Sequence, residues 1–185
     1  MENLFPLIKF MKLLKNKFKN LFLIELDTKS DFRGDFSRIF CDKIFSDFGI
    51  KFKIKQVSLA TNPKKFTLRG LHFQDHPKQE QKLLCCLKGK IWDVVVDVRK
   101  DSTTFGEWQH FELNYKNCLF IPKGFAHGYI TMTNNVELIY LIDEFYELKL
   151  NKGIIWNDKN LGIKWPQRPV LISKKDQNLS YLNNL

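Results

Sequence analysis

The chain has 185 residues, of which 44% are hydrophobic and 27% are charged. This length fits one domain, and this composition is typical of a folded globular protein, which excludes the disordered, collagen-like and disulfide-scaffold classes. The 30 Lys and Arg residues against 20 Asp and Glu give a net charge of +10, which favours anionic partners: nucleic acid, an anionic membrane surface or phosphorylated small molecules.

Residues 1 to about 19 form a basic, amphipathic N-terminal extension ahead of a single domain expected at 20–185. Apolar residues recur at helical spacing among lysines: Leu4, Ile8, Met11, Leu14 and Phe18. The pattern predicts a helix that rests on the domain, with a surface anchor on anionic lipid as the alternative. Lys9 and Lys12 interrupt the apolar run, which argues against a signal peptide.

No other stretch approaches the roughly 18 apolar residues that span a bilayer, so no integral membrane segment is expected. The cysteines have neither zinc-type nor disulfide-lattice spacing and are expected to be reduced: Cys41, Cys85, Cys86 and Cys118. Together these features favour a cytoplasmic protein.

From Leu21 onward the apolar period is two, and turn residues interrupt it at short intervals. The clearest strand is Ile91 to Arg99, where Trp92, Val94, Val96 and Val98 form one apolar face. The other expected strands are Lys53–Ser58, Leu68–Gln74, Lys82–Leu87, Trp108–Leu113, Cys118–Ile121, His127–Met132 and Val136–Asp143. Within the domain, a helix is expected only at 41–48. Many short strands without intervening helices predict an all-β fold, a closed or double-sheet barrel of the jelly-roll type.

Two histidines fall inside expected strands, His72 in LRGLHFQ and His127 in PKGFAHGY. A single strand histidine is more often a structural residue than a functional one. His72, however, shares a strand face with Gln74, and Lys82 on the next strand can meet it inside a barrel. Arg69 has the opposite parity, so it reaches the same pocket only if the strand bends, and Gly70 is the expected place for a bulge.

The last expected hairpin strand carries one phenol on an apolar face. Tyr140 alternates with Val136, Leu138 and Ile142. A buried tyrosine hydroxyl is usually a structural hydrogen bonder, so a catalytic role for Tyr140 is the less common reading of this pattern alone.

Several motifs together resemble the dTDP-4-dehydrorhamnose 3,5-epimerase family over roughly residues 21–176. They are LRGLHFQ at 68–74, QKLLCCLKGKIWDVVVDVRKDSTTFGEW at 81–108, IPKGFAHGY at 121–129, GIIWND at 153–158, LGIKWP at 161–166 and LISKKD at 171–176. The resemblance implies a cupin-type jelly-roll β-barrel with a few short peripheral helices, usually a homodimer. It also implies an epimerase of nucleotide-linked 4-keto-6-deoxyhexoses in deoxysugar, surface-polysaccharide biosynthesis, needing no metal or organic cofactor.

The same resemblance implies roles for individual residues. Removing a proton next to a ketone needs a base, a group that stabilises the enolate oxygen, and a proton donor on the other face. By motif match His72 is the base and Asp176 fixes its tautomer, while Lys82 lies near the enolate oxygen and Tyr140 returns the proton. His127 matches the second histidine of the family's GFAHGF stretch and is expected to support the pocket.

Substrate binding is where the chain departs from the family pattern. The DxRGxFxE stretch becomes residues 31–38, which keep Arg33 and Phe36 but end in Arg38. The QxNxS stretch keeps only Gln56. Arg33 and Arg69 are expected to bind the diphosphate. The changes lie at nucleotide-contacting positions, which predicts the same reaction with the identity of the nucleotide left open.

Three other readings remain. A metal cupin would use His72, His76, Glu80 and His127, but Gln74 stands where the usual His-x-His pair needs an imidazole. A nucleic-acid-binding barrel would account for the charge and the 17 phenylalanines, although these fall mostly at core positions. A catalytically silent sugar-nucleotide binder is the third. Whether one or both of C3 and C5 are inverted also remains open.

Overall fold

The computed structural model describes residues 11–14 and 16–185. Its strands are β1 Met11–Leu14, β2 Phe22–Leu26, β3 Thr28–Asp31, β4 Gly34–Ser37, β5 Gln56–Asn62, β6 Thr67–Gln74, β7 Lys82–Lys88, β8 Ile91–Asp97, β9 Trp108–Leu113, β10 Asn117–Ile121, β11 Phe125–Thr131, β12 Val136–Ile142, β13 Asn151–Gly153 and β14 Leu171–Ile172. The helices are α1 Asp42–Asp47 and α2 Lys174–Gln177, with 3₁₀ turns at Leu148–Leu150 and Leu182–Asn184.

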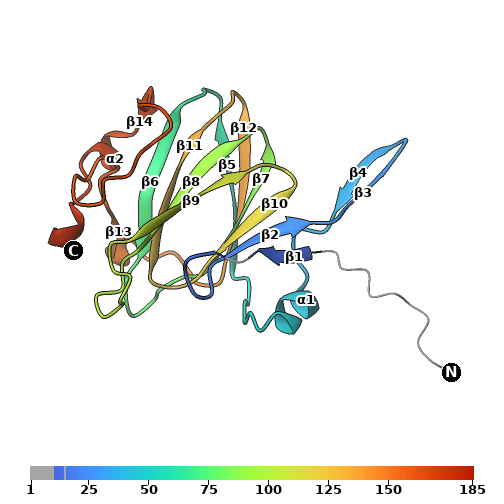
Figure 1. The fold of residues 1–185 in the computed structure, drawn as a ribbon, viewed down its shortest axis with the longest axis horizontal. Coiled ribbons are helices and arrows are strands. Elements are labelled where there is room, and N and C mark those ends of the chain that lie inside the picture. The colour runs from blue at the N-terminus through green and yellow to red at the C-terminus, as the bar shows by residue number, and fades with distance from the viewer. Residues whose placement is uncertain (1–10, 15) are drawn as a thin grey trace.

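Two main sheets face each other and form the body of the molecule (Figure 1). One is six-stranded in the order β1-β2-β10-β7-β12-β5, and the other runs β13-β6-β11-β8-β9 with β14 beside β6. The all-β jelly roll with few short helices is therefore confirmed. Within the described part of the chain, the two sheets are not hydrogen-bonded into one closed barrel.

Most expected strands agree with the structure to within two residues. β9 coincides with its expected bounds, and α1 lies inside the helix expected at 41–48. The bounds of the strand expected at Lys53–Ser58 are wrong, because β5 runs from Gln56 to Asn62. Its full length pairs with β12, from Val136 opposite Asn62 to Ile142 opposite Gln56.

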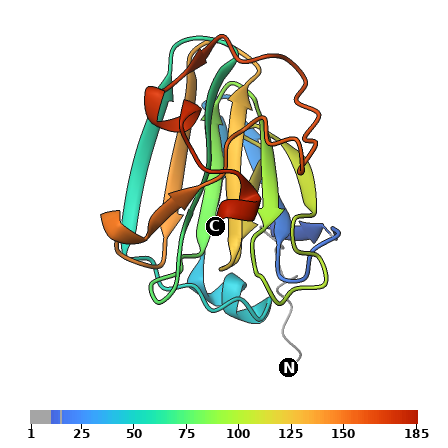
Figure 2. The same ribbon diagram turned by 90° about the vertical axis from the view of Figure 1, so that its left-hand side faces the viewer.

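Side chains on both faces of each sheet are buried, so the apolar core has three layers. The layer between the sheets includes Val95, Leu84 and Leu119. On the outer face of the β10-β7 sheet, Phe45 of α1 packs with Phe120 in a second layer. The C-terminal segment covers the apolar β8 face in a third layer that includes Trp92, Val94, Val96, Ile154 and Leu182. Figure 2 shows this segment crossing in front of the sheet.

The helix expected near the N-terminus is wrong for Met11–Leu14, which form β1. This strand pairs antiparallel with β2, from Met11 opposite Leu26 to Leu14 opposite Leu23. Strand pairing outweighs the helical spacing here, since only four residues are involved and Met11 is buried against the sheet. Leu4, Ile8 and the remainder of the extension up to residue 10, with the lipid-anchor alternative, lie outside the described residues.

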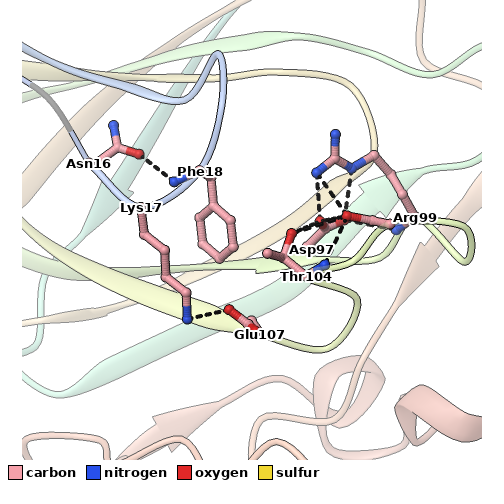
Figure 3. Close-up of polar contacts among 8 residues, drawn as sticks. Asn16, Lys17, Phe18, Asp97, Arg99, Thr104 and Glu107 are labelled. Carbon is pink, nitrogen blue, oxygen red and sulfur yellow. Dashed lines mark hydrogen bonds and ion pairs between the residues drawn. The ribbon is translucent and has the colours of Figure 1, made fainter.

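Residues 16–18 attach the start of the chain to the loop between β8 and β9 (Figure 3). The Phe18 ring packs edge-on against Phe125 at 5.3 Å between centroids and is only 4% exposed. The Lys17 ammonium lies 2.5 Å from a carboxylate oxygen of Glu107. Phe18 thus belongs to the core between the sheets and not to a separate extension.

The β3–β4 hairpin projects from the body of the molecule (Figure 1). Phe32, in its turn, is 98% exposed, and Phe36 on β4 is also exposed. No helix among residues 11–14 and 16–185 is long and apolar enough to cross a membrane.

Candidate active site

A cavity of about 630 Å³ opens between the two sheets. Six of the nine predicted site residues line it: Arg69, His72, Lys82, His127, Tyr140 and Asp176. His72 lies on β6 and His127 directly opposite it on β11, whereas Lys82 and Tyr140 lie on β7 and β12 of the facing sheet. The volume falls in the range of small-molecule sites.

The bend that lets Arg69 and His72 reach one cavity occurs at Gly70, as predicted. The register between β6 and β11 shifts between His127 and Tyr129, and Gly70 has a φ of +119°. A Cβ at Gly70 would lie 2.5 Å from the Cα of Gly128, so the close approach of the two strands also requires glycine.

His72 and Asp176 form a dyad at the cavity wall. His72 Nε2 lies 2.8 Å from Asp176 Oδ1, and the Gly70 amide donates to Asp176 Oδ2 at 3.1 Å. Burial raises the pKa of Asp176, but the bonds from His72, Gly70 and Ser173 outweigh burial and hold this pKa below its ordinary value. Asp176 is therefore a carboxylate that can orient the imidazole and stabilise its charged form. His72 keeps 30% of its side chain exposed to the cavity.

Lys82 reaches the cavity with its charge already compensated. Its ammonium lies 2.8 Å from Glu80 Oε1, and each side chain is 10% exposed. Glu80 was considered in the sequence only as a metal ligand, and its position two residues before Lys82, on the same side of an extended chain, is the signal for this ion pair.

His127 forms a second, deeper dyad, with Asp93 on β8. His127 Nδ1 lies 3.1 Å from Asp93 Oδ2. Burial, followed by the charges of Lys82 and His72, places the pKa of His127 well below its ordinary value. Burial also raises the pKa of Asp93 well above its ordinary value, against the effect of Lys82. His127 and Asp93 therefore both favour their uncharged forms. An imidazole with a lowered pKa is a weak base, so His127 is suited to supporting the pocket and not to removing a proton.

Sequence reasoning also missed Tyr129, beside Tyr140, and its hydrogen-bond partner Asn62. Tyr129 lines the same cavity and forms a side-chain hydrogen bond with Tyr140. Its hydroxyl also donates to Asn62 Oδ1 at 3.3 Å. Strand parity with His127 would have placed Tyr129 on the cavity face, whereas Asn62 was not considered.

The other three predicted site residues lie outside the cavity lining. Arg33 and Phe36 are on the projecting β3–β4 hairpin, where the Arg33 guanidinium lies 2.6 Å from Asp31 Oδ2. Gln56, at the start of β5, accepts a hydrogen bond from the Tyr146 amide at 2.6 Å. Within a single chain, the structure does not bring these residues to the His72 dyad.

The metal-cupin alternative requires several ligands around one point. Across the residues that the structure describes, no group of three or more His, Cys, Asp or Glu side chains is placed to hold a metal ion. Glu80 pairs with Lys82, and His76 is exposed.

The cavity has the groups that a carbon-centred proton transfer needs. An imidazole with an orienting carboxylate on one sheet faces a phenol on the other, with an ammonium on the same wall as the phenol. A jelly roll with this site is an isomerase of the epimerase class that acts next to a carbonyl.

Comparison with known proteins gives the family. The family model for dTDP-4-dehydrorhamnose 3,5-epimerase matches residues 15–184. The dTDP-4-dehydrorhamnose 3,5-epimerase of Shigella flexneri is 37% identical over 171 residues, which cover 91% of this chain and 94% of the relative. The chain belongs to the dTDP-4-dehydrorhamnose 3,5-epimerase family.

Solved structures of 3,5-epimerases support the same assignment to this family. The family enzyme of Bacillus anthracis, with TDP and PPi bound, superposes with a TM-score of 0.89 at 37% identity, over 92% of this chain and 99% of that one. A 3,5-epimerase from Legionella pneumophila, in complex with dTDP-4-keto-L-rhamnose, gives a TM-score of 0.89 at 33% identity, over 94% and 93% of the two chains.

Proposed function

We propose that this enzyme inverts C3, C5 or both in a nucleotide-linked 4-keto-6-deoxyhexose, as a step of deoxysugar biosynthesis. The observation that supports this most strongly is that the His72–Asp176 dyad and Tyr140 line one cavity, with His72 and Tyr140 on facing sheets. A sugar ring between them would meet a base on one side and a proton donor on the other.

The reaction proceeds in two proton transfers. His72 removes the proton from the carbon next to the ketone, and Asp176 stabilises the resulting imidazolium. The electron pair moves to the ketone oxygen, where the Lys82 ammonium stabilises the enolate. Tyr140 then protonates the same carbon from the opposite side, which inverts the centre and restores the ketone. Because burial raises the pKa of Tyr140 well above its ordinary value, the phenol holds its proton until the enolate is present.

The nucleotide diphosphate is assigned to the open side of the cavity. Arg69 lines the cavity and its guanidinium is partly exposed, so it can donate forked hydrogen bonds to phosphate oxygens. The relatives' names make a dTDP-linked sugar the first candidate, although the changes near Gln56 and at Arg38 leave other nucleotides to be tested.

Arg33 and Phe36 would join the site in a homodimer. They lie on a hairpin that extends away from its own cavity, with Phe32 and Phe36 exposed to solvent. The edge strand β5 also exposes Val57 and Leu59, a surface that natural proteins normally cover. A partner seated on this edge would place the hairpin of one protomer at the cavity of the other. We assign the enzyme to the cytoplasm, in keeping with its free thiols.

The test is incubation in D₂O with dTDP-, GDP-, CDP- and UDP-linked 4-keto-6-deoxy sugars, with NMR used to read deuterium at each ring carbon. The wild type is expected to label C3, C5 or both with one nucleotide preferred. His72→Ala should lower labelling by about 10²–10⁴-fold, because the base is lost. His110→Ala is the matched control, since His110 stacks on Trp92 outside the cavity. Labelling that survives in His72→Ala would refute the proposed reaction.

A further inference from the structure

The Tyr129 hydroxyl is a buried ionisable group that has no role in the proposed reaction. Tyr129 is 1% exposed, lines the catalytic cavity and is hydrogen-bonded to Tyr140. It ends the stretch GFAHGY, where the matching family stretch GFAHGF ends in phenylalanine. The hydroxyl is therefore not needed to fill the space, which a phenyl ring also fills.

A continuous set of polar groups connects Tyr140 to the edge of the cavity through Tyr129. The Tyr129 hydroxyl donates to Asn62 Oδ1 at 3.3 Å, and Arg69 Nε donates to the same oxygen at 2.8 Å. Tyr129 and Arg69 are also direct partners in the β11–β6 ladder. Asn62 Nδ2 is a buried donor without an acceptor in the part of the chain described. A network with one unpaired donor is incomplete, as expected where hydrogen bonds change during a reaction cycle.

The two phenols differ in their electrostatic surroundings. Burial raises the pKa of both, Tyr140 the more strongly, and the Arg69 charge opposes this at both groups. Tyr129 is therefore the more acidic of the pair, and a negative charge shared by the two phenols is favoured on Tyr129.

We propose that Tyr129 is a positioning residue that completes a two-phenol proton relay with Tyr140. When the Tyr140 O–H bond breaks and the new C–H bond of the sugar forms, the Tyr129 hydroxyl turns its hydrogen from Asn62 Oδ1 to the Tyr140 oxygen. The Tyr129 O–H bond then breaks and its proton passes to the Tyr140 oxygen. The negative charge comes to rest on Tyr129, beside Asn62 and Arg69. Water at the open side of the cavity then returns a proton to Tyr129 and removes one from the His72 imidazolium, which closes the proton balance.

This inference rests on the proposed function, in which Tyr140 is the proton donor. Proton abstraction by His72 does not involve the relay, whereas delivery of a proton from the Tyr140 side does. The relay therefore affects inversion and leaves exchange at the His72 side unchanged.

The experiment compares deuterium exchange with net inversion for the wild type, Tyr129→Phe, Tyr140→Phe and the double variant, using the sugar nucleotide that the wild type prefers. Tyr129→Phe should lower the inversion rate about tenfold while exchange stays within about twofold of the wild type. In the Tyr140→Phe background, Tyr129→Phe should change inversion by less than about twofold, because residues of one relay are not additive.

The outcomes separate the two hypotheses. Unchanged inversion in Tyr140→Phe would refute the proposed function itself. Loss of inversion in Tyr140→Phe with unchanged inversion in Tyr129→Phe would overturn only the relay. Equal loss of exchange and inversion in Tyr129→Phe, or additive effects in the double variant, would make Tyr129 structural.

A second variant guards against altered folding. Replacing Tyr129 by 3-fluorotyrosine keeps the ring and the hydroxyl but makes the phenol more acidic. Inversion should equal or exceed the wild-type rate. A fall to the level of Tyr129→Phe would contradict the relay.

Discussion

Two His–Asp pairs share one cavity, yet their surroundings give them different properties. Asp176 receives hydrogen bonds from His72 and from the Gly70 amide, which keep the carboxyl ionised. Asp93 is fully buried beside His127, and the Asp93 Oδ1 atom has no partner among the described residues. The ionised Asp176 carboxylate can stabilise a positively charged His72, whereas the uncharged Asp93 only holds the His127 ring in place.

This contrast predicts unequal effects for two identical substitutions. Asp176→Asn should reduce deuterium exchange by about 10²–10⁴-fold, since the amide cannot stabilise the His72 imidazolium. Asp93→Asn replaces an uncharged carboxyl by an uncharged amide, so exchange should fall by less than about tenfold. Exchange rates measured by NMR in D₂O decide between them, and a larger loss in Asp93→Asn would reverse the assignment of the base.

At the residue scale, the sequence predicted the groups whose strand parity is simple. His72 and Lys82 reach one cavity as parity requires, and Gly70 provides the bend for Arg69. Tyr129 was within reach of the same argument but was not considered. The Glu80–Lys82 ion pair was also within reach of this argument but was not considered. The different states of the two dyads could not be predicted, because they depend on burial and on contacts between segments distant in sequence.

At the scale of elements, the conformation of a short segment depends on the strands beside it. Met11 to Leu14 have helical spacing, but β2 offers an exposed edge and the segment pairs with it. The projecting β3–β4 hairpin and the short β14–α2 segment carry weak patterns in the sequence. The long central strands have strong period-two patterns and were predicted well, because both of their faces pack in the core.

The attachment of residues 16–18 predicts a large effect from one side chain. Phe18→Ala should lower the free energy of unfolding by about 3–5 kcal/mol, since it leaves a cavity between the sheets. Lys17→Ala is the matched control, because its ion pair with Glu107 is partly exposed and contributes about 0–1 kcal/mol. Urea unfolding at neutral pH measures both. Similar small effects would mean that this segment does not belong to the core.

The loop after β8 is predicted to make stability depend on pH. Burial raises the pKa of Asp97, but hydrogen bonds from Arg99, Ser102 and Thr104 outweigh it and lower this pKa to about 2. The folded pKa is below the unfolded value of about 3.9, so the contribution to stability is present above pH about 4 and is lost as the pH falls toward about 2. Because Arg99 is partly exposed, we expect about 1–2 kcal/mol.

Asp97→Asn separates this contribution from general acid unfolding. The variant should be less stable than the wild type at pH 7, and the difference should shrink as the pH falls through about 4. Urea unfolding of both proteins over this range gives the comparison. A difference that is constant with pH would mean that the ionised form of Asp97 is not stabilised by its partners.

At the scale of the whole molecule, the cavity and the hairpin are separated. The proposed catalytic groups come from β6, β7, β11, β12 and the α2 segment of one chain, while Arg33 and Phe36 lie on a hairpin that extends away from them. The sequence predicted all these residues as one site. Only an arrangement of two chains would unite them, and a sequence pattern does not say which chain supplies each residue.

Subunit complementation tests that arrangement. Arg33→Ala keeps an intact cavity but lacks the hairpin arginine, and His72→Ala keeps the hairpin but lacks the base. If hairpins reach across a homodimer, each mixed dimer has one complete site, formed by His72 of the Arg33→Ala chain and Arg33 of the other. Unfolding the two variants together and refolding them should restore about a quarter of the wild-type sites under random pairing, whereas each variant refolded alone should stay at its own low rate. Epimerisation that rises no higher than the average of the two separate variants would mean that every site uses the hairpin of its own chain or none.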